Sequence, residues 1–375
     1  MSAWRSFSLV VAVVGFYYGC APVEFDRDEN FNPCQGFPQE CRREDGYDVF
    51  DYSITTGDGL VDILFIDDNS GSMYPEQQKM GEKFPNFISS LQSLDYRIAI
   101  TTTDIQSDRN PPRPINGNGA LQNGRLIEYA PGLKYIARST PNANTLFLNT
   151  IRRTETLGCE QSNFASDSCP SGDERGIYAA WEAINRNELS FIRPNAHLAL
   201  VIIADENERS ADTQTRSSNS FWDQHYPFDS KDRPETLVQL VNSKFSNSKT
   251  FSVHSIVVKD ATCKNSQYQQ AGVSAYYGDA YMALSNLTEG HIGSICAADY
   301  GAEMGSIGAA IVDRVASVKI ACRPKDDQVI VTFTPQPNPP IQVTLDTVNN
   351  EVDFSQIVPP GTQVRLQYSC LVEYP

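Results

Sequence analysis

The sequence is poor in histidine and lacks the short motifs of several enzyme classes. Its four histidines are scattered without the spacing of zinc ligands, and no Cys-x-x-Cys pair occurs, so no zinc site is expected. No Gly-x-Ser-x-Gly sequence is present, which removes the strand–turn–helix context of a serine hydrolase nucleophile. No Gly-x-x-x-x-Gly-Lys-[Ser/Thr] sequence is present either, which removes the usual P-loop NTPases.

Basic residues are also scarce. The chain of 375 residues has 30 lysines and arginines against 46 aspartates and glutamates, which gives a formal net charge of −16. A surface this acidic repels phosphate backbones, so nucleic acid is not expected as a partner. The same charge suits divalent cations or basic partners. The hydrophobic fraction of 40% is enough to form a substantial core.

Long apolar runs are missing too, since none reaches the roughly 20 residues that a membrane-spanning helix needs. The short apolar stretch 8–19 follows Arg5 and indicates a signal peptide over residues 1–19. Gly19-Cys20 resembles the lipobox of bacterial lipoproteins, which implies a lipid on Cys20 that anchors the protein to a membrane. Ala21 after this cysteine implies an outer-membrane lipoprotein of the bacterial cell envelope, facing the periplasm or the exterior. The alternative is ordinary signal cleavage, with Cys20 left as a thiol or paired.

The other eight of the nine cysteines form an even set, as expected for disulfides in an exported chain. Sequence alone leaves their connectivity open. We expect neighbours to pair because each pair then falls within one local segment. The expected pairs are Cys34–Cys41, Cys159–Cys169, Cys263–Cys296 and Cys322–Cys370.

The chain divides into three parts after the signal peptide. Residues 20–56 are acidic with little periodicity, so we expect a tether with one small loop between Cys34 and Cys41. Residues 57–318 alternate apolar strands with helical segments, which predicts an α/β domain doubly wound around a mainly parallel sheet. The strands are expected at 61–67, 96–103, 197–204 and 250–258, and the helices at about 80–91, 142–153, 173–186, 237–245, 279–287 and 302–315. Residues 319–375 alternate apolar and polar residues between proline-rich turns, which predicts a small C-terminal antiparallel β module.

A chemically distinctive turn follows the first expected strand. Asp68, Ser70 and Ser72 present a carboxylate and two hydroxyls at alternate positions, where they can converge on one point. Their oxygens are hard ligands, suited to Mg²⁺, Mn²⁺ or Ca²⁺ and poor for zinc. In sheets of this kind ligands bind outside the carboxyl ends of the strands, which is where this turn lies.

The apolar strand, the pattern Asp68-x-Ser70-x-Ser72 and the amphipathic helix after it together resemble a von Willebrand factor A (VWA) domain with its metal-ion-dependent adhesion site. The resemblance covers roughly residues 57–318 and implies a VWA or Rossmann-like fold. It also implies a further metal ligand at the end of a later strand, and Asp205 occupies that place.

The family also uses a threonine three residues before a glycine that begins a helix, and here the sequence departs from the pattern. The matching glycine is Gly176, and Asp173 stands at the threonine position with Glu174 beside it. A carboxylate there could bind the metal directly or through water, favouring Ca²⁺ or weakening the attraction for an acidic partner. Equally, Asp173 could cap its helix. Ser171 is a third candidate for this ligand position.

The resemblance implies a binding module rather than an enzyme. Mg²⁺ or Ca²⁺ held by Asp68, Ser70, Ser72, Asp205 and Asp173 would keep one position open for a carboxylate of a protein partner, in adhesion or another envelope interaction. One alternative is a metal-assisted hydrolase that uses the same carboxylates, for which no histidine base or paired-metal carboxylate set is evident. Another is a structural envelope protein with a vestigial metal site, which the departure at Asp173 would favour.

Overall fold

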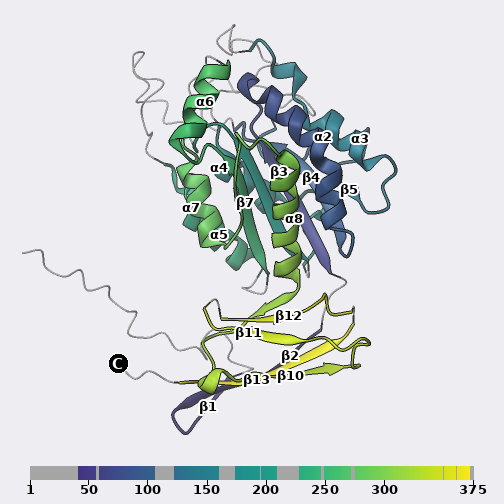
Figure 1. Cartoon of the computed structure of the whole chain (residues 1–375), viewed down its shortest axis with the longest axis vertical. Helices are drawn as coiled ribbons and strands as arrows, with labels where there is room; N and C mark the ends of the chain where they lie inside the picture. Colours follow the sequence, from purple (N-terminus) through teal and green to yellow (C-terminus); the bar gives the residue numbers. More distant parts are fainter. Residues whose placement is uncertain are drawn as a thin grey trace, which may run out of the picture.

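A computed structural model describes residues 41–55, 59–105, 122–159, 174–194, 196–208, 228–245, 249–271, 275–348, 350–359 and 361–371. These residues form an α/β domain and a smaller β domain (Figure 1). The α/β domain has a six-stranded sheet in the order β5-β4-β3-β6-β7-β8. The strands are β3 (Leu60–Asp67), β4 (Asp95–Thr102), β5 (Ile136–Ala137), β6 (His197–Ala204), β7 (Phe251–Val257) and β8 (Ile292–Ser294). All neighbours pair in parallel except β4 and β5, which confirms the expected mainly parallel α/β sheet.

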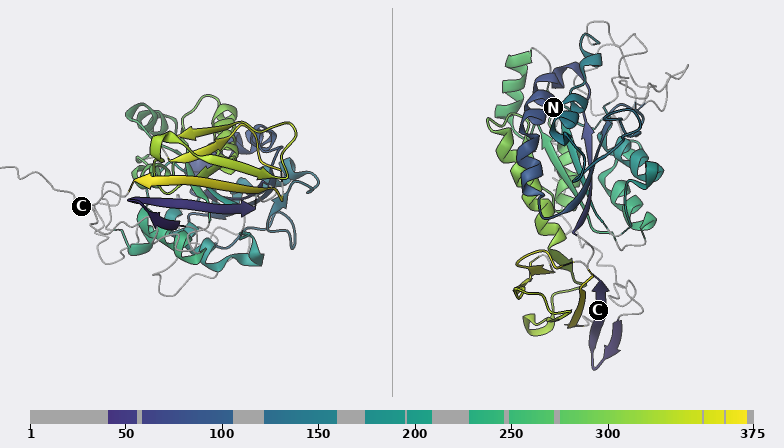
Figure 2. Two further views of the ribbon diagram at one scale, coloured as in Figure 1. Left: turned by 90° about the horizontal axis from the view of Figure 1, so that it is seen from below. Right: turned by 90° about the vertical axis from the view of Figure 1, so that its right-hand side faces the viewer.

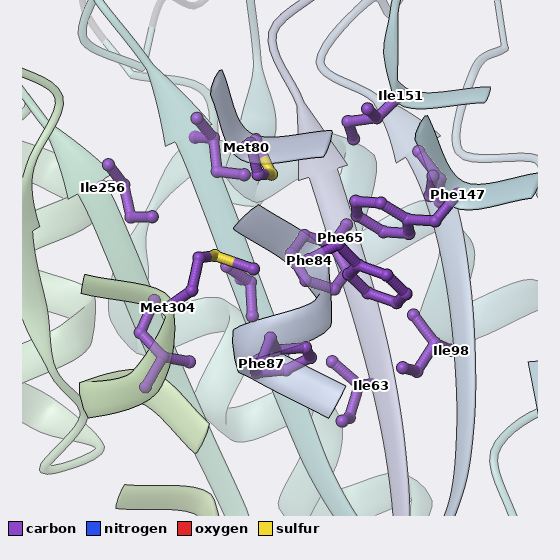
Figure 3. Packing of buried hydrophobic residues seen from close by; sticks show 14 of the residues in the cluster. Ile63, Phe65, Met80, Phe84, Phe87, Ile98, Phe147, Ile151, Ile256 and Met304 are labelled. Carbon is purple, nitrogen blue, oxygen red and sulfur yellow. The ribbon is translucent and has the colours of Figure 1, made fainter. Parts of the chain in front are cut away.

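Helices cover both faces of this sheet, which is seen edge-on in the right-hand view of Figure 2. One face is covered by α2 (Tyr74–Ser90), α3 (Ala143–Ile151) and α8 (Tyr300–Val315), and the other by α4 (Gly176–Arg186), α5 (Pro234–Lys244) and α7 (Asp279–Leu287). Side chains alternate along each strand, so β3 contributes Phe65 to the core under α2 and Leu64 to the core under α4. Figure 3 shows Phe84 and Phe87 of α2 over Phe65, with Phe147 of α3 beside them.

The expected elements of the α/β domain are confirmed where both the apolar pattern and its period were clear. The apolar runs form β3 and β6, which are buried on both faces as predicted. Helix α6 (Ala261–Ala271) was not expected, because its sequence is polar and has little helical periodicity. Its buried residues include Cys263, which forms a disulfide with Cys296 ahead of α8. The helix is therefore held by a covalent bond as well as by packing.

The β domain consists of two antiparallel sheets that enclose a separate core. One sheet has the order β1-β2-β13-β10 and the other the order β11-β12-β9. The strands are β1 (Cys41–Glu44), β2 (Tyr47–Thr55), β9 (Ser317–Lys319), β10 (Ile330–Thr334), β11 (Val343–Asp346), β12 (Glu351–Phe354) and β13 (Gln363–Leu371). Phe50 and Leu366 of the first sheet share this core with Val352 and Phe354 of the second. The disulfide Cys322–Cys370 closes it at one side.

The expectation that residues 20–56 form an acidic tether is wrong for residues 41–55. Strand β2 pairs with β13 along its whole length, from Tyr47 opposite Leu371 to Thr55 opposite Gln363. The acidic residues that suggested a tether are paired with arginines instead. Asp48 is buried with Arg43 at 2.9 Å, and Asp51 accepts two hydrogen bonds of 2.7 Å from Arg365. The α/β domain is therefore an insertion within the β domain, between β2 and β9.

Both connections of the inserted domain meet the same short segment of the β domain. Gly59, just before β3, lies against Ile357, and the carbonyl of Ala316, just after α8, accepts a hydrogen bond of 2.9 Å from the backbone of Phe354. The strands β3 and β6 run away from this junction, so their carboxyl ends lie at the far end of the α/β domain (Figure 1).

Several expectations fall on residues outside the described ranges. These are the signal peptide 1–19, the lipidation site Cys20, the remaining tether 20–40, and the cysteines Cys34 and Cys169. Cys41 and Cys159 are disulfide-bonded, and their expected pairings with Cys34 and Cys169 stay predictions. Of the helices in the described ranges, none combines the length and apolar character needed to cross a membrane.

Candidate metal site

Asp68 and Asp205 lie side by side at the carboxyl edge of the sheet. Strands β3 and β6 are parallel neighbours, with Asp67 opposite Ile203. The backbone amide of Asp68 extends this pairing by donating to the carbonyl of Ile203 at 2.9 Å. Each aspartate therefore follows directly from a buried strand, and the sheet itself sets their separation. This is the juxtaposition that the sequence predicted.

The turn after β3 brings the two serines to the same place. The backbone amide of Ser70 donates to Asp68 Oδ1 at 2.8 Å, which closes the turn over the carboxylate. The hydroxyl oxygens of Ser70 and Ser72 lie 2.9 Å apart. Ser72 also makes a side-chain hydrogen bond with Asp205, so the turn of β3 touches the end of β6. Four of the five predicted ligand residues thus lie together.

Two carboxylate oxygens of this group are buried without a hydrogen-bond partner among the described residues. They are Asp68 Oδ2 and Asp205 Oδ1, and their residues are 0% and 3% exposed. Buried carboxylates without partners are costly when charged. Burial, together with the charges of Glu174 and Asp205, holds the pKa of Asp68 well above its usual range. Burial and Glu174 likewise raise the pKa of Asp205 to about 7.

Another buried carboxylate at this edge is Glu174, which directly follows Asp173 in the sequence. It forms an isolated antiparallel bridge with Asp104, just after β4, and is 6% exposed. Its charge raises the pKa of both Asp68 and Asp205. Asp173 and Ser171 lie outside the described residues, so the role of Asp173 stays a prediction.

Sequence reasoning missed the residue that supports the turn from below. The Gln77 side chain donates to the backbone carbonyl of Asp68 at 2.8 Å and to Asp67 Oδ2 at 3.1 Å. It also accepts from the backbone amide of Arg153 at 2.9 Å, so it joins α2 and the chain after α3 to the turn. A signal was present, because Gln77 continues the apolar stripe of Met80 and Phe84 at helical spacing. A buried glutamine on such a stripe needs polar partners.

The donor set fits a hard divalent cation. It combines two carboxylates that have unpartnered buried oxygens with two hydroxyls, on backbone fixed by parallel strands. Within the described residues, no group of three or more His, Cys, Asp or Glu side chains has the arrangement of a metal site. The candidate site has two carboxylates and two serine hydroxyls, so it is not a group of three such side chains.

Comparison with known proteins gives structural neighbours only. No family model matches the sequence, and no curated protein matches it. A von Willebrand factor type A protein from Catenulispora acidiphila is 12% identical, with 87% of this chain and 61% of that chain covered and a TM-score of 0.35. The adhesive tip pilin GBS104 from Group B Streptococcus agalactiae is 11% identical, with 86% and 82% covered and a TM-score of 0.31. The manganese-loaded TRAP protein of Plasmodium vivax is 12% identical, with 64% and 76% covered and a TM-score of 0.28.

At this level of identity the similarity concerns the fold and says nothing about activity or partners. The chain also spans less than two thirds of the Catenulispora protein. Three features of the molecule itself indicate its fold. They are the strand order, the helices on both faces, and the carboxylate and hydroxyls that follow β3. Together these features fit residues 59–316 to a von Willebrand factor A or Rossmann-like α/β fold.

Proposed function

We propose that the α/β domain binds one divalent cation through Asp68, Ser70, Ser72 and Asp205 and uses it to bind a protein partner. The observation that carries this proposal is the pair of buried oxygens, Asp68 Oδ2 and Asp205 Oδ1, which have no hydrogen-bond partner among the described residues. Two such groups on adjacent strands repel one another when ionised, and a cation between them removes that repulsion.

The residues of this chain hold the cation at an open edge. Ser70 is 5% exposed and Ser72 is half-buried, and both offer hydroxyl oxygens beside the two buried aspartates. A cation held by these residues would supply a positive charge for a carboxylate oxygen of a protein partner. Mg²⁺ and Ca²⁺ both suit this oxygen donor set. Glu174 adds negative charge beside it, which favours the cation and opposes an acidic partner.

The wider setting of the proposal is an exported protein of the bacterial cell envelope. A lipid on Cys20 anchors the N-terminal end, and Asp173 contributes to the site directly or through water; both residues are named from the sequence alone. Interaction with a partner through a metal-dependent surface is a binding role, so no catalytic reaction is proposed.

Isothermal titration calorimetry with MgCl₂ and with CaCl₂ tests the cation site. We expect saturable binding near one ion per chain for the wild type, and loss of that binding in Asp68→Ala and in Asp205→Asn. Asp313→Ala, which removes an exposed carboxylate on α8, is the matched control and should bind as the wild type does. Circular dichroism checks that each variant is folded. Unchanged affinity in a folded Asp68→Ala protein would refute the assignment.

Pull-down from envelope extract tests the partner role. The wild-type chain is used with excess Mg²⁺ or Ca²⁺ and again with EDTA, beside Asp68→Ala and Asp313→Ala. A partner that uses the cation is retained by the wild type and by Asp313→Ala, and it is lost with EDTA and with Asp68→Ala. Proteins retained equally by all four samples do not depend on this site.

A further inference from the structure

The residue that follows Glu174 in the chain forms a buried ion pair. Arg175 is 0% exposed, and its Nε and one terminal nitrogen each lie 2.8 Å from an oxygen of Asp232, which is also 0% exposed. The same terminal nitrogen lies 3.3 Å from Asp229. Asp232 is the last residue of η4 (Ser230–Asp232) and also accepts from the backbone amide of Asp229 at 2.9 Å. The pair therefore joins the chain before α4 to the chain before α5.

The backbone around Arg175 is fixed on its other side by the sheet. Its amide donates to the carbonyl of Thr103 at 2.9 Å, and Glu174 bridges Asp104. Residues 174 and 175 thus pair with the two residues that follow β4. The amide of Thr103 in turn donates to the carbonyl of Asp67 at 3.0 Å, so residue 174 lies one chain away from the turn that carries Asp68. From there the charge of Glu174 acts on Asp68 and Asp205.

The segment after Asp205 is tied to the same place. Glu208 accepts hydrogen bonds from the backbone amides of Ile177 and Tyr178, at 2.8 and 3.1 Å, in the first turn of α4. Carboxylates are favoured at this end of a helix because its free amides and dipole are positive there. The loops that carry Glu174 and Asp205 are therefore joined through α4, next to the guanidinium of Arg175.

We propose that Arg175 is a positioning residue that fixes Glu174 beside the cation site by its bidentate pairing with Asp232. The proposal rests on the cation binding argued above. Only arginine fits this role, because its planar fork meets both carboxylate oxygens at once, which fixes the direction of the side chain and hence of its neighbour. Lysine keeps the charge but pairs as a point, so the bridge to Asp104 would then hold the direction of residue 174 without the fork.

A double-mutant cycle in cation affinity, measured by calorimetry, tests the proposal. Arg175→Lys and Glu174→Gln are each expected to weaken cation binding by about 10-fold, the lower range for a residue that supports a metal ligand. In a Glu174→Gln background, Arg175→Lys is expected to change affinity by less than about twofold, because its effect acts through Glu174. Asp232→Asn, which keeps the shape of the side chain, repeats the test if Arg175→Lys fails to fold.

Arg193→Lys is the matched control, since Arg193 forms the corresponding pair with the buried Asp62 (Nε to Oδ1, 2.8 Å) at the amino end of the sheet. It should lower thermal stability and leave cation affinity unchanged. Equal losses from Arg175→Lys in the wild-type and Glu174→Gln backgrounds would overturn the proposal, as would unchanged affinity in both Arg175→Lys and Asp232→Asn. A wild-type protein that binds no cation would instead refute the proposed function itself.

Discussion

The hydroxyl oxygens of Ser70 and Ser72 lie 2.9 Å apart, so one serine donates a hydrogen bond to the other. Ser72 is also hydrogen-bonded to Asp205, which can only accept when it is ionised. Ser70 is likewise hydrogen-bonded through its side chain to Asp68, so in the ionised protein the two hydroxyl hydrogens are shared among three contacts.

Replacing either serine by alanine should weaken cation binding while the fold is kept. Each substitution removes an oxygen worth about 1.5–3 kcal/mol in contact with a charge, or about 10- to 100-fold in affinity. Titration calorimetry of Ser70→Ala and Ser72→Ala measures this. Ser243→Ala, at an exposed hydroxyl on α5, should bind as the wild type does. Equal affinity in all three variants would exclude the hydroxyls as ligands.

Without cation, the α/β domain should lose stability as the pH rises toward 7. Asp205 has a pKa raised to about 7 by burial and by Glu174, whereas the unfolded value is 3.8. Between these two values the folded state binds more protons than the unfolded state, so the free energy of unfolding falls as the pH rises. The loss is on the order of a few kcal/mol at most, because the buried carboxylates titrate together.

Thermal unfolding followed by circular dichroism, in EDTA at pH 5.5 and pH 8, checks this. The drop in Tm should be smaller in Asp205→Asn than in the wild type, and the difference between the two proteins measures Asp205 together with the carboxylates coupled to it. Added Ca²⁺ should raise Tm more at pH 8 than at pH 5.5, since protons compete with the cation. Identical pH dependence in the two proteins would contradict the argument.

Acid should destabilise the domain through two histidines at the other end of the sheet. His197 and His254 are buried, and Ser252 is hydrogen-bonded to both, at 2.8 and 3.0 Å. Burial lowers the pKa of each to about 3, from 6.5 in the unfolded chain. The unfolded state therefore binds more protons between pH 6.5 and 3, and stability falls as the pH falls through this window.

Each histidine contributes a slope of about 1.4 kcal/mol per pH unit in this window. Urea unfolding at several values between pH 6.5 and 4 should show a shallower pH dependence for His197→Gln than for the wild type. The variant need not match the wild type in absolute stability, because only the slope is compared. A slope unchanged in His197→Gln would show that this imidazole is not held neutral.

The insertion of the α/β domain predicts which fragments fold. A fragment 59–316 contains both of its own cores and should give cooperative thermal unfolding. A fragment 317–371 lacks β2 and exposes the edge of β13, so it should be unfolded or aggregated. Joining residues 41–55 to it through a short linker should restore a folded β domain, seen as dispersed NMR signals. A folded fragment 317–371 would show that β2 is dispensable.

The parts of the fold that sequence predicted are those that need only local pattern. Strand β6 was expected at residues 197–204 and has those bounds, because an apolar run buried on both faces has few other conformations available. Strand β2 was missed because its partner is β13, more than 300 residues away. Composition also does not show that its aspartates pair with arginines. Long-range pairing of this kind leaves no periodic signal.

The candidate site also has residues that the sequence predicted and residues that it did not. Asp68, Ser70 and Ser72 form one short motif, and Asp205 follows a strand that is easy to recognise, so sequence placed all four at one edge. Arg175 and Asp232 are 57 positions apart and each looks like an ordinary surface residue in the sequence. Only the fold reveals that both are buried, and burial is what makes their pairing obligatory.

Gly59 and Ala316, at the two ends of the inserted domain, touch the β domain within one short stretch, at Ile357 and Phe354. A unit whose entry and exit lie this close can be exchanged for another without disturbing the pairing of β2 with β13. In this arrangement the α/β domain can be replaced as a unit while the β domain is kept. Changes at the far edge of its sheet, where the proposed cation site lies, are therefore remote from the β domain.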